Sequence, residues 1–112
     1  MSEYRSETYL LQLIKSNFTV SGKFKVKQGS DVLMDLDLNN IKFKNCMILG
    51  GDFCSSIFRN CTFDNVLFKD LALVGVNFDN CDFIECKFSN IQPGFSMKDC
   101  NVGGLIITQE SF

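Results

Sequence analysis

The sequence predicts a repeat solenoid in which the backbone turns a corner every five residues. Eight of the twelve phenylalanines share one register of period five, so every fifth residue from 43 to 88 is large and apolar. A period of five matches neither the 3.6-residue period of an α-helix nor the two-residue period of a flat strand. A fixed repeat means that one structural unit is stacked many times. The predicted core register is Phe43, Ile48, Phe53, Phe58, Phe63, Phe68, Leu73, Phe78, Phe83 and Phe88.

Two further columns follow the same period. Two residues before each register position the side chain is mostly small or slim, which predicts a second inward column. Two residues after it the chain carries mostly Asn, Asp, Gly or Ser, which suit turns because they tolerate positive φ or bond their own backbone. Each unit therefore reads slim inward, outward, large inward, outward, turn. The slim column adds four cysteines to the predicted core: Cys46, Cys61, Cys81 and Cys86.

These units resemble those of the pentapeptide-repeat family. The best matches are VNFDN (76–80), CDFIE (81–85), CTFDN (61–65) and CKFSN (86–90). The resemblance is strong from 41 to 91 and weak from 31 to 40, and it resumes after a slip beyond 91. The position before the large residue departs from the family at Met47, Ile57, Leu67 and Lys87.

The resemblance implies an all-β fold, a right-handed quadrilateral β-helix of about four coils spanning residues 31–112. Four repeats would complete one square coil, so residues twenty apart would lie above one another at the inter-strand spacing of about 4.8 Å. The implied core columns are Phe43, Phe63 and Phe83; Ile48, Phe68 and Phe88; and Leu38, Phe58 and Phe78.

Residues 1–30 differ from the rest. Apolar residues at helical spacing predict a helix from Ser2 to Phe18, with Ser2 or Ser6 as its N-cap. Partial alternation from Phe18 to Lys27 predicts two short strands around Ser21-Gly22. We expect this segment to cap the N-terminal end of the solenoid, because an open end would expose edge hydrogen bonds and core phenylalanines. The alternative is that the helix mediates self-association.

Where the repeat is interrupted, Gln92-Pro93-Gly94-Phe95 predicts a type II turn. Beyond it the last repeats end in apolar residues without an evident polar cap. An uncapped apolar end favours pairing with a second copy, and relatives of this fold often dimerise through that end. We therefore expect a homodimer through the C-terminal coil.

The composition of the chain indicates its cellular location and the kinds of partner that it can bind. The net charge of −2 argues against direct nucleic-acid binding, because phosphate binding needs clustered Lys and Arg. No apolar run is long enough to predict a membrane span, and the first residues do not resemble a signal peptide. Five of the six cysteines fall in the slim inward column and only Cys54 should point outward. We therefore expect reduced thiols and a cytoplasmic protein.

The chain offers no catalytic, cofactor-binding or metal-binding set. It contains no His, the commonest general base and metal ligand. Neither Gly50-Gly51 nor Gly103-Gly104 has the spacing or the Lys of a phosphate loop. Cys54 is the one candidate nucleophile and lacks a His partner. We expect a protein that is not an enzyme and needs no cofactor.

Function is therefore sought on the outer surface. Lys44 should stack near Asp64 and Arg59 near Asp79, in pairs that stabilise slightly. Contiguous exposed apolar groups suggest a contact surface, unless the N-terminal helix folds over them. The candidate partner surface is Met47, Leu49 and Leu67, with Val74 on the next side.

The resemblance implies one function and the apolar surface another. Some relatives mimic B-form DNA and bind DNA gyrase or topoisomerase IV, so this chain could occupy one of these or another nucleic-acid-binding enzyme, as a bacterial, phage or plasmid inhibitor would. The alternative is a rigid scaffold that presents its apolar surface to a protein partner. Salt should distinguish them, because screening weakens binding by charge mimicry more than binding by an apolar surface.

Overall fold

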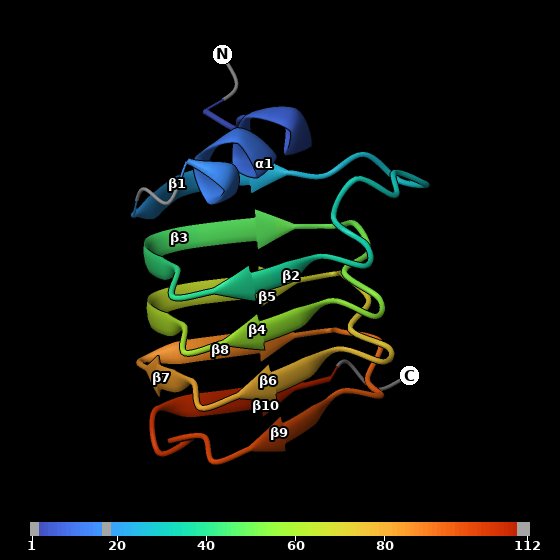
Figure 1. Cartoon of the computed structure of the whole chain (residues 1–112). Coiled ribbons are helices and arrows are strands. Elements are labelled where there is room, and N and C mark those ends of the chain that lie inside the picture. The colour runs from blue at the N-terminus through green and yellow to red at the C-terminus, as the bar shows by residue number, and fades with distance from the viewer. Residues whose placement is uncertain (1–2, 17–18, 110–112) are drawn as a thin grey trace.

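The computed structural model describes residues 3–16 and 19–109, in which one helix is followed by ten strands (Figure 1). In chain order these are α1 (Glu7–Lys15), β1 (Val20–Lys25), β2 (Asp37–Asn39), β3 (Lys42–Leu49), β4 (Ile57–Arg59), β5 (Thr62–Lys69), β6 (Asn77–Asp79), β7 (Asp82–Ile84), β8 (Cys86–Ser89), β9 (Ser96–Lys98) and β10 (Leu105–Thr108).

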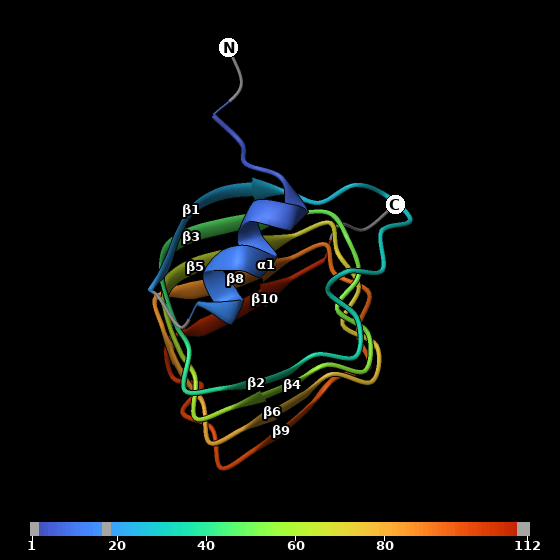
Figure 2. The same ribbon diagram turned by 45° about the horizontal axis from the view of Figure 1, so that its top comes forward.

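The strands form two parallel sheets that wind into a solenoid of about four coils. One sheet has the order β1-β3-β5-β8-β10 with β7 also on β5, and the other has the order β2-β4-β6-β9. Phe43 lies beside Phe63 and Phe63 beside Phe83, which confirms the twenty-residue stacking. Viewed closer to the solenoid axis, the coils have a four-sided outline (Figure 2).

The inward register forms one continuous aromatic core. All ten of its residues are at most 1% exposed. The rings of Phe43, Phe63 and Phe83 are stacked nearly parallel, with centroids 4.9 Å apart at each step. Rings from adjoining columns meet edge to face, as Phe63 does with Phe68 at 5.9 Å. Both arrangements are favourable for aromatic rings, so the core gains from ring geometry as well as from apolar burial.

The corners depend on the residue two places after each register position. That residue has a positive φ at every corner from Asp35 to Asn90, between 50° and 75°. Asn and Asp hold most of these corners because their short polar side chains tolerate the left-handed region. Asparagine side chains also link successive coils at the corners: Asn80 donates to Asn60 at 2.7 Å and Asn65 donates to Asn45 at 2.9 Å.

The N-terminal helix is shorter than predicted. It runs from Glu7 to Lys15, and the Ser6 hydroxyl accepts from the Tyr9 amide at 3.3 Å as its N-cap. It cannot begin earlier because Arg5 is extended and pairs with Phe24 as a parallel bridge. The predicted limits Ser2 and Phe18 lie outside the described residues. Helix α1 lies over the open N-terminal end of the coils (Figure 2), where Leu10 and Ile14 are buried against the core.

The prediction of two short strands around Ser21-Gly22 was wrong, because one strand, β1, passes through both residues. Its register on β3 shifts between Val20 and Gly22, and Gly22 has a φ of 115°. A bulge at glycine thus replaces the expected break. Because β1 pairs in parallel with β3, it continues the main sheet, and the N-terminal segment is joined to the solenoid by backbone hydrogen bonds.

The repeat slips by one residue in the last coil. Phe78 pairs with Met97 and Phe88 with Ile107, an offset of nineteen in place of twenty. The predicted type II turn at residues 92–95 is absent from the described chain: the Gln92 carbonyl accepts from the Leu73 amide, and the Gly94 carbonyl accepts from the Gly75 amide. The segment is thus held along the preceding coil. No helix among the described residues is long and apolar enough to cross a membrane.

Candidate interaction surface

One side of the solenoid carries a half-buried apolar patch. Met47 pairs with Leu67 across β3 and β5, and Leu49 lies two residues from Met47 on the same outer face. All three are partly exposed, whereas Ile48 and Phe68, which follow Met47 and Leu67 in their strands, point into the core. Strand alternation explains this arrangement, because residues two apart face the same way. We call the outward residues of this side, on β1, the second half of β3 and β5, β8 and β10, the Met47 face.

Lysines border the apolar patch along the stack. One column of the Met47 face reads Lys23, Met47, Leu67, Lys87 and Ile106 from coil to coil. The neighbouring column reads Lys25, Leu49, Lys69, Ser89 and Thr108. The outward positions of this face therefore hold four lysines and no carboxylate.

The N-terminal helix does not cover this patch. It lies across the end of the solenoid (Figure 2), so the alternative in which it folds over the patch was wrong. The N-terminal segment does contact Met47 through Tyr4, whose hydroxyl lies 3.9 Å from the Met47 sulfur. The helix instead buries Leu10 and Ile14 against the core at the coil end.

Val74 belongs to a different side of the solenoid. It is 41% exposed and follows the buried Leu73, around a corner from the Met47 face. The Ser55 amide donates to the Val74 carbonyl at 3.1 Å, which places Cys54 and Val74 on successive coils. Val74 is therefore an exposed apolar residue that is separate from the patch on the Met47 face.

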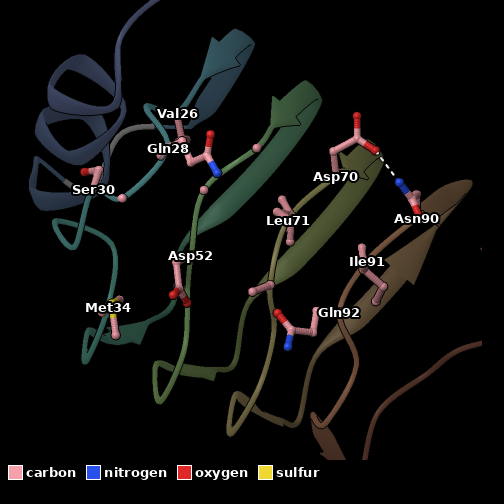
Figure 3. A pocket seen from close by; sticks show the side chains of 14 residues that line it. Val26, Gln28, Ser30, Met34, Asp52, Asp70, Leu71, Asn90, Ile91 and Gln92 are labelled. Carbon is pink, nitrogen blue, oxygen red and sulfur yellow. Dashed lines mark hydrogen bonds between the residues drawn. The ribbon is translucent and has the colours of Figure 1, made fainter.

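The same side as Val74 contains a shallow depression of about 690 Å³ (Figure 3). Its wall includes Gly50 and Gly51, which have no side chain, and Ala72, which has a small one, so the surface there is hollow. Asp70 accepts from Asn90 at 2.8 Å on its rim. Figure 3 shows Asp52 and Gln92 beside it, on the two coils that flank the coil of Ala72. These groups are neither buried nor convergent, so the depression lacks the geometry of a reaction site.

The six cysteines are all free thiols. Cys81 and Cys86 are buried and donate to the carbonyls of Phe58 and Phe63 at 3.2 and 3.0 Å, each 23 residues earlier. The buried Ser56 hydroxyl makes the same bond to the Leu33 carbonyl at 2.8 Å. The slim column thus ties each coil to the one before it.

The surroundings of Cys46 and Cys54 keep these two thiols protonated. Burial raises the pKa of Cys46 to about 12. Burial and a hydrogen bond with Asp52 raise the pKa of Cys54, the candidate nucleophile, which is half-buried. Because the thiolate is the reactive form, neither cysteine is activated. Among residues 3–16 and 19–109 no cluster of potential ligands could hold a metal ion.

The charged pairs elsewhere partly follow prediction. Lys44 pairs in register with Asp64 and Arg59 with Asp79, as the twenty-residue stacking predicts. The ion pair of Arg59 is nevertheless formed with Asp37 of the preceding coil, at 3.6 Å. Both side chains of that ion pair are well exposed, so its contribution to stability is small.

Sequence reasoning missed the lysine border. The twenty-residue rule could have placed Lys69 under Leu49 and Lys87 under Leu67. It could not have placed Lys23 and Lys25, because β1 lies on β3 with an offset of 24 residues. That offset depends on the bulge at Gly22 and on the connection between β1 and β2.

The fold defines the class of protein as a parallel β-solenoid with a capped N-terminal end. The family model for pentapeptide repeats matches residues 61–92, with eight copies of the repeat. The chain therefore contains pentapeptide repeats, and the register and corners continue the same pattern to Asp35 on the N-terminal side. No curated protein matches the chain.

Proposed function

We propose that this protein is a non-catalytic interaction scaffold that binds a protein partner through the Met47 face. The observation that carries the proposal is the patch of Met47, Leu49 and Leu67, held by rigid strands and left uncovered by the N-terminal helix. Contiguous apolar groups on an outer surface mark contact sites. A stacked β-solenoid presents such a patch without a conformational change, which lowers the entropic cost of binding.

The proposed role involves no catalysis, in keeping with pentapeptide-repeat proteins, which are generally non-enzymatic scaffolds. The chain has no His, and its half-exposed thiol at Cys54 has a raised pKa. Catalytic groups need pKa values near the working pH, which these surroundings do not supply. We therefore also propose that it needs no cofactor.

A pull-down from cell lysate tests the scaffold. The double variant Leu49→Lys/Leu67→Lys should lose the partner that wild-type protein captures at both low and high salt. Ile84→Lys is the matched control, because Ile84 is 43% exposed on the adjoining side. Equal capture by wild-type protein and the double variant would refute this use of the face.

The alternative function is mimicry of DNA toward gyrase, topoisomerase or another nucleic-acid-binding enzyme. It draws support from carboxylates on the other sides, among them Asp37, Asp64 and Asp82. Lys42, Lys44 and Arg59 interrupt these carboxylates, and the net charge is only −2. A mimic requires a continuous phosphate-like field, so the scaffold is the better supported. Capture of such an enzyme at low salt only, unaffected by Leu49→Lys/Leu67→Lys, would favour the mimic.

We also propose that the protein is cytoplasmic, with reduced thiols. We further propose that it forms a homodimer through its C-terminal coil. Ile107 continues the Phe88 column, yet it is 49% exposed because no described coil follows it. Ile107→Lys should convert a dimer into a monomer in sedimentation equilibrium at about 50 µM. A monomeric wild-type protein under the same conditions would exclude the dimer.

A further inference from the structure

The Met47 face differs from the rest of the surface in its charge. Its outward positions carry Lys23, Lys25, Lys69 and Lys87 and no carboxylate, in a chain whose net charge is −2. Asp70 directly follows Lys69 in the chain, but it lies at a corner, at the edge of the Met47 face. Its carboxylate accepts a hydrogen bond from Asn90 at 2.8 Å. The positive charge is thus concentrated around the apolar patch.

Within residues 3–16 and 19–109, three of these four lysines have no carboxylate partner. Among the described residues the ion pairs are Lys23 with Glu3, at 3.9 Å, and Arg59 with Asp37. Lys25, Lys69 and Lys87 are exposed and unpaired in this set. Their charges are therefore free to meet an external anion, with no internal ion pair to break first.

The spacing between coils sets the distances between the lysines that border the apolar patch. Lys23 and Lys87 lie in one column three coil steps apart, so their backbones are separated by about 14 Å. Met47 and Leu67 occupy the two positions between these lysines, one coil step of about 4.8 Å apart. An α-helix rises 1.5 Å per residue, so about nine residues of helix span the distance between the lysines. Apolar residues at positions i and i+3 or i+4 along that helix match the spacing of the two apolar side chains.

We propose that the partner of this scaffold presents an acidic amphipathic helix, which lies along the solenoid axis on the Met47 face. Its apolar stripe packs on Met47, Leu49 and Leu67, and carboxylates on its borders meet the lysines. This inference rests on the proposed scaffold function and specifies the chemistry of the partner. The apolar centre argues against nucleic acid, since phosphate recognition gains nothing from three half-buried aliphatic side chains.

Fluorescence polarisation with a synthetic peptide tests the proposal. The probe is a labelled helical peptide of about 16 residues, with leucines three and four apart and glutamates on both borders. Wild-type protein should bind it, and binding should weaken as NaCl is raised, because exposed charges are screened. Lys69→Glu/Lys87→Glu should weaken binding by about tenfold or more, since reversed rim charges repel the glutamates.

The matched control is Lys42→Glu/Lys44→Glu. It makes the same change in net charge with two exposed lysines on an adjoining side of the solenoid, and it should alter binding by less than about twofold. A peptide with glutamine in place of glutamate should bind about as weakly as the Lys69→Glu/Lys87→Glu variant binds the acidic one. Circular dichroism should show that both double variants remain folded.

Several outcomes would overturn the proposal: no binding by wild-type protein at millimolar peptide, equal loss in both double variants, or equal affinity for the glutamine peptide. Binding to phosphatidylserine vesicles in preference to the peptide, lost in Lys69→Glu/Lys87→Glu, would assign the face to an anionic membrane instead. If Leu49→Lys/Leu67→Lys abolishes capture of the cellular partner while Lys69→Glu/Lys87→Glu does not, the scaffold stands and the acidic helix is refuted.

Discussion

Val26 occupies the space that a side chain on Gly51 would need. A Cβ built on Gly51 would lie 2.4 Å from Val26 Cγ1, and Gly51 has a φ of 94°. The Val26 amide donates to the Leu49 carbonyl at 2.8 Å, so the valine is held over the first full coil. The contact joins the N-terminal cap to the solenoid at a position where the repeat lacks its usual slim side chain.

Gly51→Ala should therefore destabilise the protein by about 2–4 kcal/mol, because it combines a steric clash with an unfavourable φ. Urea denaturation would measure the change. Gly29→Ala is the control, since Gly29 also has a positive φ, of 84°, but has no atom within 4 Å of an added Cβ. Equal destabilisation by the two substitutions would show that the Val26 contact contributes nothing.

Phe63→Ala should cost about 3–5 kcal/mol in the free energy of unfolding. Phe63 is stacked between Phe43 and Phe83 and also meets the rings of neighbouring columns, so its loss opens a cavity at the centre of the core. Phe95→Ala, in the half-buried last coil, should cost less than half as much. A change under about 1 kcal/mol for Phe63→Ala would contradict the role of the aromatic columns.

Ser56→Ala should cost about 1–3 kcal/mol, because it leaves buried backbone groups without partners. The Ser56 hydroxyl donates to the Leu33 carbonyl at 2.8 Å and accepts from the Leu36 amide at 3.1 Å. Ser56→Cys should recover part of the loss, since Cys86 makes the equivalent thiol bond to Phe63. If alanine and cysteine are equally destabilising, the link between coils does not depend on a donor in the slim column.

Stability should fall at high pH in a manner that depends on Cys46. Its folded-state pKa of about 12 lies above the ordinary value of 9.0 because of burial. The stabilisation from the protonated thiol is complete below pH 9 and is lost as pH rises toward 12, since the unfolded thiol ionises first. Urea denaturation between pH 8 and about 10.5 should show wild-type protein losing about 1–2 kcal/mol more than Cys46→Val. Valine suits the site, because Val66 occupies the next position of the column. Parallel pH curves would disprove the effect.

The sequence alone determined the repeat, and through it most of the solenoid. Period five identified the residues that are now seen buried, and the Asn, Asp, Gly and Ser positions are the corners with positive φ. Such features are local, because a short unit that repeats must take the same conformation in every coil. The pairing of Met47 with Leu67 could be predicted for the same reason, as could the positions of Lys69 and Lys87 beside them.

Only the tertiary structure decided how the ends are built. The offset between β1 and β3 depends on the bulge at Gly22 and on the fit of Val26 over Gly51, which are contacts between segments that share no repeat. It brings Lys23 and Lys25 onto the Met47 face and leaves α1 over the end of the coils. The one-residue slip before β9 likewise follows from how residues 92–95 lie on the preceding coil. The repeat determines the conformation of each coil within the stack. The structure of each end depends instead on long-range contacts, which no sequence period predicts.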